Sequence, residues 1–305
     1  MDKDHINSLL ELSLPELILA ADKIRRESVG SKIELCSIIN AKSGLCNQDC
    51  KFCAQSSRHS TGVERYPLKK KEEMLEAAKR AQGTGAQRFG IVTSGATVRR
   101  EELGVICDTV AEIITKVGIR VCASLGSLDE EAFRLLKQAG LSRYHHNIET
   151  SPGYFSNITI THTFQDRIDT IISAKKTGLQ VCSGGIIGMG ETLNDRIEMA
   201  LYLKELNVDS VPVNILVPIK GTPLEKQEQL SPMEAIRSIA LFRIILKDKI
   251  VRIAAGRESV LKDFQALAFM AGANGMLIGG YLTIRGREID EDKRLVKEVE
   301  DLWRR

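Results

Sequence analysis

The sequence has few aromatic residues, little net charge and no long hydrophobic run. Phenylalanine, tyrosine and tryptophan together make up 5% of the 305 residues, which argues against a platform that stacks nucleic-acid bases. The formal net charge of +3 is too small to indicate a polyanionic partner. No apolar run approaches the roughly 18 residues that a membrane-spanning helix requires. We therefore expect neither a nucleic acid nor a membrane among the partners.

The sequence also lacks the pattern of a signal peptide, because it begins with the polar and acidic residues Met1 to His5. Its seven cysteines are odd in number and clustered, unlike the cysteines of a disulfide framework. Both features predict a cytoplasmic protein in a reducing environment.

Three of the cysteines, Cys46, Cys50 and Cys53, form a C-x3-C-x2-C motif. Three thiolates on one short loop can hold three corners of a [4Fe–4S] cluster and leave the fourth iron free to bind another molecule. A closed structural zinc site needs four ligands, usually in C-x2-C pairs, and no fourth candidate lies near this motif in the sequence. The spacing therefore favours an iron–sulfur cluster, with a zinc site or incidental thiols as the alternatives.

Short β-rich runs alternate with helical patterns along most of the chain. Eight strands, each followed by a helix, predict an α/β fold, a closed (β/α)8 barrel of the TIM type, with an open doubly wound sheet as the alternative. Amphipathic helical stretches before this pattern predict an N-terminal helical extension over residues 1–31, followed by the barrel and a C-terminal helix over residues 32–305. The predicted strands span residues 33–39, 88–93, 119–125, 143–148, 179–184, 210–216, 250–254 and 275–279. The predicted helices span residues 72–84, 101–117, 129–139, 164–177, 192–206, 232–246, 259–271 and 290–303.

Cys36, Cys122, Cys182 and Arg252 fall on the first, third, fifth and seventh predicted strands. Interior layers of a (β/α)8 barrel take their side chains from alternate strands, so these four residues are expected to form one inward layer. A buried arginine is costly without an anionic partner, and an iron–sulfur cluster held by the three thiolates would supply one. The alternative is that each cysteine is a small packing residue, which is the interpretation we favour for Cys107 on a predicted helix.

Polar residues at the ends of predicted strands are the candidate ligand contacts. The Glu149 carboxylate is a candidate to accept hydrogen bonds from ligand hydroxyls such as those of a ribose, and Asn147 is a candidate to pair with amide or urea groups; the alternative is that both are polar residues facing a loop. Asn214, in an apolar strand, indicates a further contact. The glycine-rich segment 184–191 allows close approach of a ligand such as adenine, or simply forms a tight turn. The histidines at positions 145, 146 and 162 are interpreted as local hydrogen-bonding residues.

The C-x3-C-x2-C motif with Phe52 before the last cysteine resembles the radical S-adenosylmethionine (SAM) superfamily. This resemblance implies a [4Fe–4S] cluster whose open iron binds the amino and carboxylate groups of SAM. An electron from the cluster then splits SAM into methionine and a 5′-deoxyadenosyl radical.

A wider set of segments, over about residues 33–285, resembles the biotin synthase family. The resemblance implies a homodimeric barrel that inserts sulfur into dethiobiotin, with two hydrogen abstractions, a sulfur-donating auxiliary cluster and an electron donor of the flavodoxin or ferredoxin type. It also implies that Asn147, Glu149 and Arg167 contact SAM or substrate, that Asn214 contacts the substrate and that Arg252 contacts the auxiliary cluster. Phe52, Gly185 and Ile186 are further candidates for cofactor contact. The matching segments are 43–46, 53–57, 147–151, 181–185, 213–214, 220–224, 251–258 and 271–274.

The sequence departs from the better-known members of that family at two positions. Gly90 stands where those members have a cysteine, and Cys36 stands where they have a serine. The number of thiolates is kept, but one has moved from the second strand to the first. We therefore expect Cys36, Cys122 and Cys182 to hold an auxiliary cluster near Arg252, of a four-iron type rather than the [2Fe–2S] type. The iron without a cysteine ligand would carry the donated sulfide, and the absence of a side chain at Gly90 would make room.

Two other functions are compatible with parts of the pattern. Another radical SAM enzyme, such as a methylornithine synthase or a hydrogenase maturase, would share the barrel and the loop motif. A non-catalytic iron–sulfur carrier would leave the predicted SAM contacts unexplained.

Overall fold

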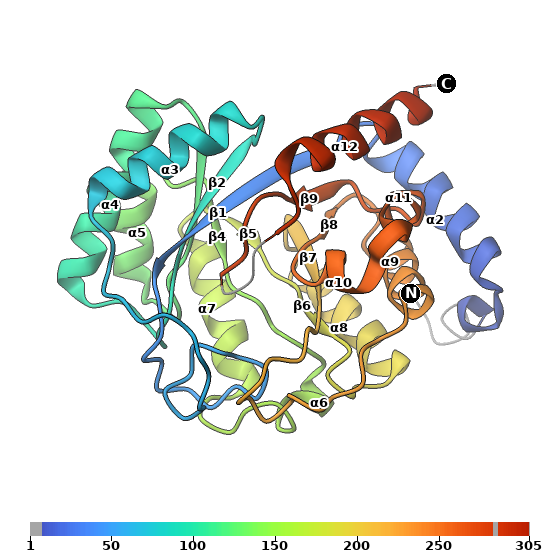
Figure 1. Cartoon of the computed structure of the whole chain (residues 1–305), viewed down its shortest axis with the longest axis horizontal. Helices are drawn as coiled ribbons and strands as arrows, with labels where there is room; N and C mark the ends of the chain where they lie inside the picture. The colour runs from blue at the N-terminus through green and yellow to red at the C-terminus, as the bar shows by residue number, and fades with distance from the viewer. Residues whose placement is uncertain (1–7, 283–285, 305) are drawn as a thin grey trace.

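The computed structural model describes residues 8–282 and 286–304, and its centre is a closed barrel of parallel strands (Figure 1). The order in the sheet is β5-β4-β3-β2-β1-β9-β8-β7-β6, and β5 also pairs with β7 through Cys182 and Ser210. This pairing closes the ring, so the predicted (β/α)8 barrel is confirmed and the open sheet is wrong. The strands are β1 (Glu34–Lys42), β2 (Arg88–Thr93), β3 (Arg120–Ser124), β4 (Arg143–His145), β5 (Gln180–Cys182), β6 (Gly185–Ile187), β7 (Ser210–Ile215), β8 (Ile250–Ile253) and β9 (Gly275–Leu277).

Helices cover the outside of the strands because parallel neighbours need a crossover connection. The N-terminal ends of several of these helices are stabilised by local hydrogen bonds. The Thr192 hydroxyl accepts a hydrogen bond from the Asp195 backbone N–H, and the Asp195 carboxylate accepts one from the Thr192 backbone N–H, which forms a capping box. The helices between strands are α3 (Lys71–Gly83), α4 (Arg100–Lys116), α5 (Glu130–Gln138), α7 (Phe164–Lys176), α8 (Leu193–Glu205) and α9 (Pro232–Leu246).

The alternation of side chains along β2 shows how the barrel separates its core from its cavity. Phe89 and Ile91 are buried among apolar residues of the strand–helix core. Arg88, Gly90 and Val92 face the opposite way and line the cavity inside the barrel. Successive residues of a strand point to opposite faces, so a strand that is apolar toward the helices can still present chemically active groups to the interior.

The helical segment predicted over 259–271 is not one helix. It consists of α10 (Arg257–Leu261), a 3-10 helix (Lys262–Phe264) and α11 (Gln265–Met270). Lys262 has a φ of 47°, which is in the left-handed region and cannot continue a right-handed helix. A further short helix, α6 (Pro152–Phe155), was not predicted.

The predicted strand 179–184 is also divided, because β5 ends at Cys182 and β6 begins at Gly185. The predicted strands 143–148 and 275–279 end early, at His145 and Leu277. Beyond His145 the backbone follows the divided strand through single hydrogen bonds, from His146 N–H to the Cys182 carbonyl and from Ile148 N–H to the Gly184 carbonyl. It then reaches Glu149, which has a φ of 69°. These departures lie at one end of the barrel, where the candidate site residues are found.

Helix α2 (Leu14–Ser28) packs against α9 and α11 on the outside of the barrel, beside α12 (Ile289–Trp303) (Figure 1). The guanidinium carbon of Arg25 lies 3.7 Å from the centroid of the Trp303 ring, which joins the two terminal helices. The predicted extension over 1–31 includes residues 1–7, which lie outside the described residues, and its boundary stays a prediction. No helix of the described part has both the length and the apolar character needed to cross a membrane.

Candidate active site

The barrel encloses a cavity of about 790 Å³. Its wall includes both sets of cysteines, the polar residues Asn147, Glu149, Arg167, Asn214 and Arg252, and the apolar side chains of Phe52 and Ile186. One cavity therefore brings together every predicted site residue except Gly185. The cysteines that line it are Cys36, Cys46, Cys50, Cys53, Cys122 and Cys182.

The loop that carries Cys46, Cys50 and Cys53 follows β1 at the C-terminal end of the barrel strands. Its shape is fixed by Asp49, whose carboxylate accepts hydrogen bonds from the hydroxyls of Thr159 (2.6 Å) and Thr161 (2.7 Å). Burial acts to raise the pKa of Asp49, but these hydrogen bonds outweigh it and hold the pKa well below its ordinary value. The cysteine loop is thus attached to the segment after α6.

Two of the loop thiols, Cys50 and Cys53, carry protons when no metal replaces them. Burial raises the pKa of Cys50 to about 12 and that of Cys53 to about 11. Since thiolates are the metal-binding form, binding of a metal or cluster would release these protons. Within residues 8–282 and 286–304, no three histidine, cysteine, aspartate or glutamate side chains converge closely enough to hold one metal ion. A structural zinc site needs four side chains that converge on one ion, whereas the thiols around a multi-iron cluster attach to different irons.

Arg167 connects the cysteine loop to the end of β4. Its Nη1 lies 3.9 Å from Oε1 of Glu149, and its Nη2 lies 3.0 Å from Nε2 of His162. The other ring nitrogen of His162 is 2.8 Å from Oε1 of Gln48, between two of the loop cysteines. Burial raises the pKa of Glu149, and the charge of Arg167 opposes this effect. These contacts place the Glu149 carboxylate and the Arg167 guanidinium beside the cysteine loop.

Asn147 and Asn214 each connect neighbouring backbone segments of the cavity wall by hydrogen bonds. Asn147 accepts a hydrogen bond from Gly184 N–H at 3.1 Å and donates to Oε2 of Glu149 at 3.2 Å. Asn214 donates to the Gly185 carbonyl at 3.1 Å and accepts from Ala255 N–H at 3.2 Å. Each amide group has two donors and two lone pairs, so each keeps one donor and one lone pair for a ligand.

Gly184 and Gly185 were expected to allow close approach of a ligand, but the structure gives them another role. A β-carbon at Gly184 would lie 2.0 Å from the Pro212 carbonyl oxygen, and one at Gly185 would lie 2.2 Å from the Glu149 carbonyl oxygen. Neither glycine lines the cavity in the described part of the chain. The chain itself requires these glycines where β6 packs against its neighbours, and Ile186 is the residue of this segment that faces the cavity.

Cys36, Cys122 and Cys182, here called the three-cysteine layer, point inward at one level of the barrel. The strand register pairs Gly90 with Cys122 and His145 with Cys182. Burial raises the pKa of Cys36 to about 12, and the nearby thiols of Cys122 and Cys182 act in the same direction. Arg252 is 4% exposed and lies beside Cys36 and Cys182. The predicted inward orientation of the four residues is therefore confirmed, while their ligand roles remain predictions.

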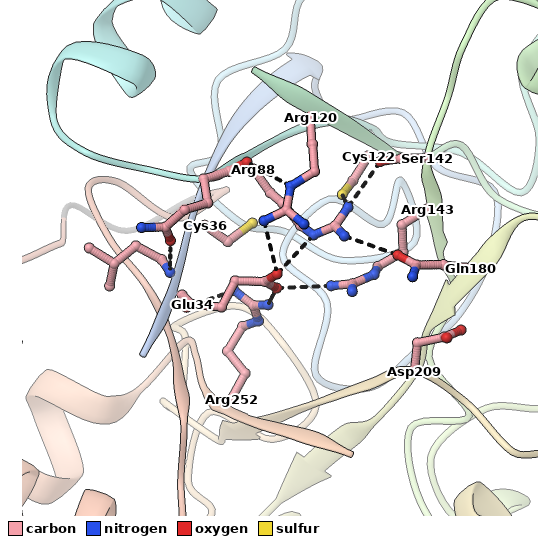
Figure 2. A network of polar contacts seen from close by, with 12 residues as sticks. Glu34, Cys36, Arg88, Arg120, Cys122, Ser142, Arg143, Gln180, Asp209 and Arg252 are labelled. Carbon is pink, nitrogen blue, oxygen red and sulfur yellow. Dashed lines mark hydrogen bonds and ion pairs between the residues drawn. The ribbon is translucent and has the colours of Figure 1, made fainter. Parts of the chain in front are cut away.

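The anionic partner of Arg252 within the protein is Glu34, which the sequence analysis missed. The carboxylate of Glu34 also contacts the buried Arg88 and Arg143 and, at 3.5 Å, the half-exposed Arg120, and Figure 2 shows the four guanidinium groups around it. Burial alone would raise the pKa of Glu34, but the charges of the three buried arginines outweigh it and lower the pKa to about 2. Strand periodicity could have indicated this residue, since Glu34 is two positions before Cys36 on β1.

The histidines differ from the prediction that all three are local hydrogen-bonding residues. His162 fits it through Arg167 and Gln48. His145 and His146 make no side-chain hydrogen bonds within the described residues, although His145 lines the cavity. Burial lowers the pKa of His145 to about 4, so this imidazole is neutral at physiological pH.

Comparison with known proteins relates this cavity to a family of enzymes. Residues 42–203 match the radical SAM superfamily and residues 212–300 match the biotin and thiamin synthesis associated domain. The chain is 52% identical to the biotin synthase of Thermotoga petrophila over 300 residues, which cover 98% of this chain and 99% of that protein. It is 48% identical to the biotin synthase of Carboxydothermus hydrogenoformans, over 98% of this chain and 95% of that protein.

Solved structures share the fold at low sequence identity. A methylornithine synthase superposes with a TM-score of 0.84 at 22% identity, covering 99% of this chain and 92% of that chain. The FeFe-hydrogenase maturase from Carboxydothermus hydrogenoformans superposes with a TM-score of 0.78 at 20% identity, covering 97% of this chain and 77% of that chain. These similarities concern the barrel alone.

Proposed function

Because the chain belongs to the biotin synthase family, we propose that it converts dethiobiotin to biotin by SAM-dependent radical insertion of sulfur. The observation that carries this proposal is the single cavity lined by two separate sets of three cysteines. One set suits the generation of a radical and the other suits the supply of sulfur. A methylornithine synthase or a maturase, the other enzyme classes considered, would leave the three-cysteine layer without a purpose.

The donor set of the loop fits a [4Fe–4S] cluster, because Cys46, Cys50 and Cys53 all face the cavity on one loop. When bound, this cluster supplies the electron that cleaves SAM, and the auxiliary cluster supplies the sulfur. Asp49 keeps the three thiols in place through its hydrogen bonds to the segment after α6. The pKa values of Cys50 and Cys53 indicate that these residues lose protons as the cluster is loaded.

The side chains around the loop are suited to hold SAM. Glu149 binds the ribose hydroxyls and Arg167 fixes the Glu149 carboxylate while it contacts the loop through His162. Asn147 offers its remaining amide hydrogen to SAM or to the substrate. Phe52 and Ile186 supply an apolar wall for the adenine ring. Gly185 acts indirectly, because its close packing against the Glu149 carbonyl places Ile186 in this wall.

The substrate is expected between the loop and the three-cysteine layer. Asn214 lines this region and keeps one donor and one acceptor for the urea group of dethiobiotin. The reactive carbons must lie within contact distance of the radical, because hydrogen abstraction depends on close and oriented approach. The enclosing barrel also excludes water and protects a reactive intermediate.

The charges around the three-cysteine layer favour an anionic auxiliary cluster. Three buried arginines and one glutamate leave two uncompensated positive charges at this level. A doubly positive iron–sulfur core bound by three thiolates and one hydrosulfide carries two negative charges, and buried charges are tolerated when they are paired. The charge is the same for a two-iron and a four-iron core, so the four-iron type is proposed from the cysteine pattern: one thiolate lies on the first strand, at Cys36, in place of the second, at Gly90. We assign Cys36, Cys122 and Cys182 to this cluster beside Arg252.

Iron and sulfide analysis with Mössbauer spectroscopy tests this assignment on anaerobically reconstituted protein. We expect about eight irons per chain, because each four-iron cluster adds four, and a loss of about half in Cys36→Ala. Cys107→Ala is the matched control, since Cys107 lies on α4 outside the cavity. About four irons per chain, unchanged by Cys36→Ala, would contradict the second cluster.

A turnover assay distinguishes the proposed biotin synthase activity from another radical SAM enzyme and from a non-catalytic iron–sulfur carrier. Anaerobic protein with SAM, dethiobiotin and dithionite should produce biotin and 5′-deoxyadenosine. Formation of 5′-deoxyadenosine without biotin, with both clusters intact, would favour another radical SAM enzyme. Absence of both products would favour a non-catalytic iron–sulfur carrier.

The surface beside the cysteine loop suits an acidic electron donor of the flavodoxin or ferredoxin type. Two apolar side chains are exposed there, Leu45 at 68% and Ile160 at 82%. The exposed cations Lys51 and Arg58 lie on the same loop, and Arg58 donates to the Asn47 carbonyl. An apolar centre with basic neighbours is complementary to an acidic partner. A homodimer and a cytoplasmic location follow from the family and the cysteine usage, and form part of the same proposal.

A further inference from the structure

The Glu34 carboxylate is a single point at which three buried arginines from different strands meet, and the half-exposed Arg120 of β3 adds a fourth contact at 3.5 Å. Its Oε1 lies 2.6 Å from Nη2 of Arg252 and 3.0 Å from Nη1 of Arg143, and its Oε2 lies 3.1 Å from Nε of Arg88. These arginines come from β8, β4 and β2, while Glu34 begins β1. Each of the three is at most 4% exposed. Figure 2 shows these three guanidinium groups and that of Arg120 around the carboxylate.

The network cannot be explained by charge neutralisation alone. Three buried guanidinium groups carry three positive charges, and one carboxylate removes one of them. A buried charge without a partner is destabilising. Arg143 makes its only side-chain hydrogen bond within the described residues to Glu34, and its Nε has no partner. Glu34 therefore arranges the arginines and reduces their net charge, but it leaves an excess that suits an anion.

The arginines extend from Glu34 toward the three-cysteine layer. Arg88 contacts Glu34 through Nε and the Cys122 sulfur through Nη1, at 3.8 Å. It also donates to Ser142 and Gln180, so its guanidinium is held at every nitrogen. Arg252 lies beside Cys36 and Cys182. A change at Glu34 can therefore affect Cys122 through its contact with Arg88, and Cys36 and Cys182 through the charge of Arg252.

We propose that Glu34 is a positioning residue for the sulfur-donating site. It holds Arg88, Arg143 and Arg252 against the three-cysteine layer and sets the electrostatic environment of the cluster bound there. This inference rests on the proposed function. Charge and hydrogen bonding around an iron–sulfur cluster tune its reduction potential, and residues behind the ligands orient them.

Two substitutions separate the effect of the Glu34 charge from the effect of its side-chain length. Glu34→Gln keeps the size and removes the negative charge, so the reduction potential of the auxiliary cluster should shift to a more positive value. Glu34→Asp keeps the charge but is too short to reach all three arginines, so the potential should stay near that of the wild type. Both variants should lose iron from this cluster to a chelator about 10–100-fold faster, as outer contacts of metal sites typically contribute this much. EPR-monitored redox titration and chelator kinetics measure the two effects.

A charge-compensated variant provides a stringent check. Glu34→Gln combined with Arg143→Gln restores an excess of two positive charges, and its potential should return toward the wild-type value. Glu102→Gln is the matched control, because it removes a carboxylate that pairs with Lys42 outside the cavity. Its potential and rate of iron loss should equal those of the wild type.

Thermal unfolding of the cluster-free protein adds a readout that does not depend on turnover. Glu34→Gln should unfold at a lower temperature than the wild type, and the double variant should regain part of the loss. A wild-type potential and iron release rate in Glu34→Gln would overturn the positioning role. If Glu34→Gln does not fold, an unchanged iron release rate in Glu34→Asp overturns it instead. A wild-type protein without a second cluster would contradict the proposed function itself, before any variant is compared.

Discussion

A β-carbon added to Gly90 would lie 3.0 Å from Cγ2 of Ile38 on the neighbouring strand. The two residues are Cα partners in the β1–β2 ladder, and Ile38 lines the cavity beside Gly90. The space at Gly90 is thus already partly filled by Ile38. This contact corrects the expectation that the absent side chain simply makes room for a larger cluster.

Replacing Gly90 by cysteine should destabilise the protein, even though cysteine occupies this position in better-known relatives of the family. Overpacking a filled interior typically costs about 1–3 kcal/mol of unfolding free energy. Urea unfolding of the cluster-free protein measures this cost. Gly90→Cys in an Ile38→Ala background should recover most of it, and an equal cost in both backgrounds would contradict the contact as the cause.

Asp49 should control the retention of the loop cluster. Asp49→Asn removes the carboxylate that accepts hydrogen bonds from Thr159 and Thr161, and hydrogen bonds to charged groups contribute about 1.5–3 kcal/mol each. The loop should therefore release iron faster, while the auxiliary cluster keeps its spectrum. Asp129→Asn, at the N-terminus of α5, is a control of the same chemistry far from the loop. Equal iron release from both variants would show that Asp49 does not hold the loop.

Charge reversal beside the cysteine loop should affect only the protein electron donor. Lys51→Glu with Arg58→Glu should slow biotin formation with a flavodoxin-type donor, because electrostatic attraction increases association rates about tenfold or more. The effect should weaken as salt is added. Turnover with dithionite is the internal control and should be unchanged. Slower turnover with both reductants would indicate damage to the site and not to docking.

Glu102 should make folding stability dependent on pH in the acid range. Burial acts to raise its pKa, but hydrogen bonds from Lys42 and Arg99 outweigh it and lower the pKa to about 2, from an ordinary value of 4.5. A lowered carboxylate pKa contributes stability above about pH 4.5, and this contribution is lost as the pH falls toward 2. Glu102→Gln should therefore destabilise the protein at pH 7 by about 1–2 kcal/mol, after allowance for solvent screening.

Unfolding by urea at several pH values measures this dependence. The difference in unfolding free energy between the wild type and Glu102→Gln should decrease below pH 4.5 and disappear near pH 2. Glu76→Gln, which removes a carboxylate paired with Lys79 on the surface, should show only a weak trend, because solvent screens an exposed ion pair. If this difference in unfolding free energy does not change with pH, the ion pair with Lys42 is not its cause.

The positions of Cys36, Cys122, Cys182 and Arg252 inside the barrel were predictable because two regularities act together. Side chains alternate along each strand, and barrel layers draw on alternate strands. Residues far apart in the sequence can therefore be assigned to one level without knowledge of their contacts. The cysteine loop was equally predictable from the sequence, because its three thiols lie within eight residues.

Other features depend on contacts that no periodicity encodes. The role of Glu34 arises only when three arginines from other strands converge on it. Gly184 and Gly185 have ordinary φ angles and are required by neighbouring carbonyl groups, which become visible only in the packed barrel. The apolar pattern of 259–271 continues through Lys262, although the backbone there turns into the left-handed region.

Strand β1 carries Glu34 and Cys36 near its start and leads directly into the loop with Cys46. The number of residues in the strand therefore sets the distance between the two cluster sites, at about 3.3 Å per residue. The regular part of the strand ends at a β-bulge between Asn40 and Lys42, which already absorbs one extra residue. Before this bulge, deleting one residue after Cys36 would turn Glu34 and Cys36 out of the barrel, whereas deleting two would keep them inside but about 7 Å closer to the loop. Variation in the length of this regular part is thus restricted to even steps, and each step changes the distance between the radical source and the sulfur source.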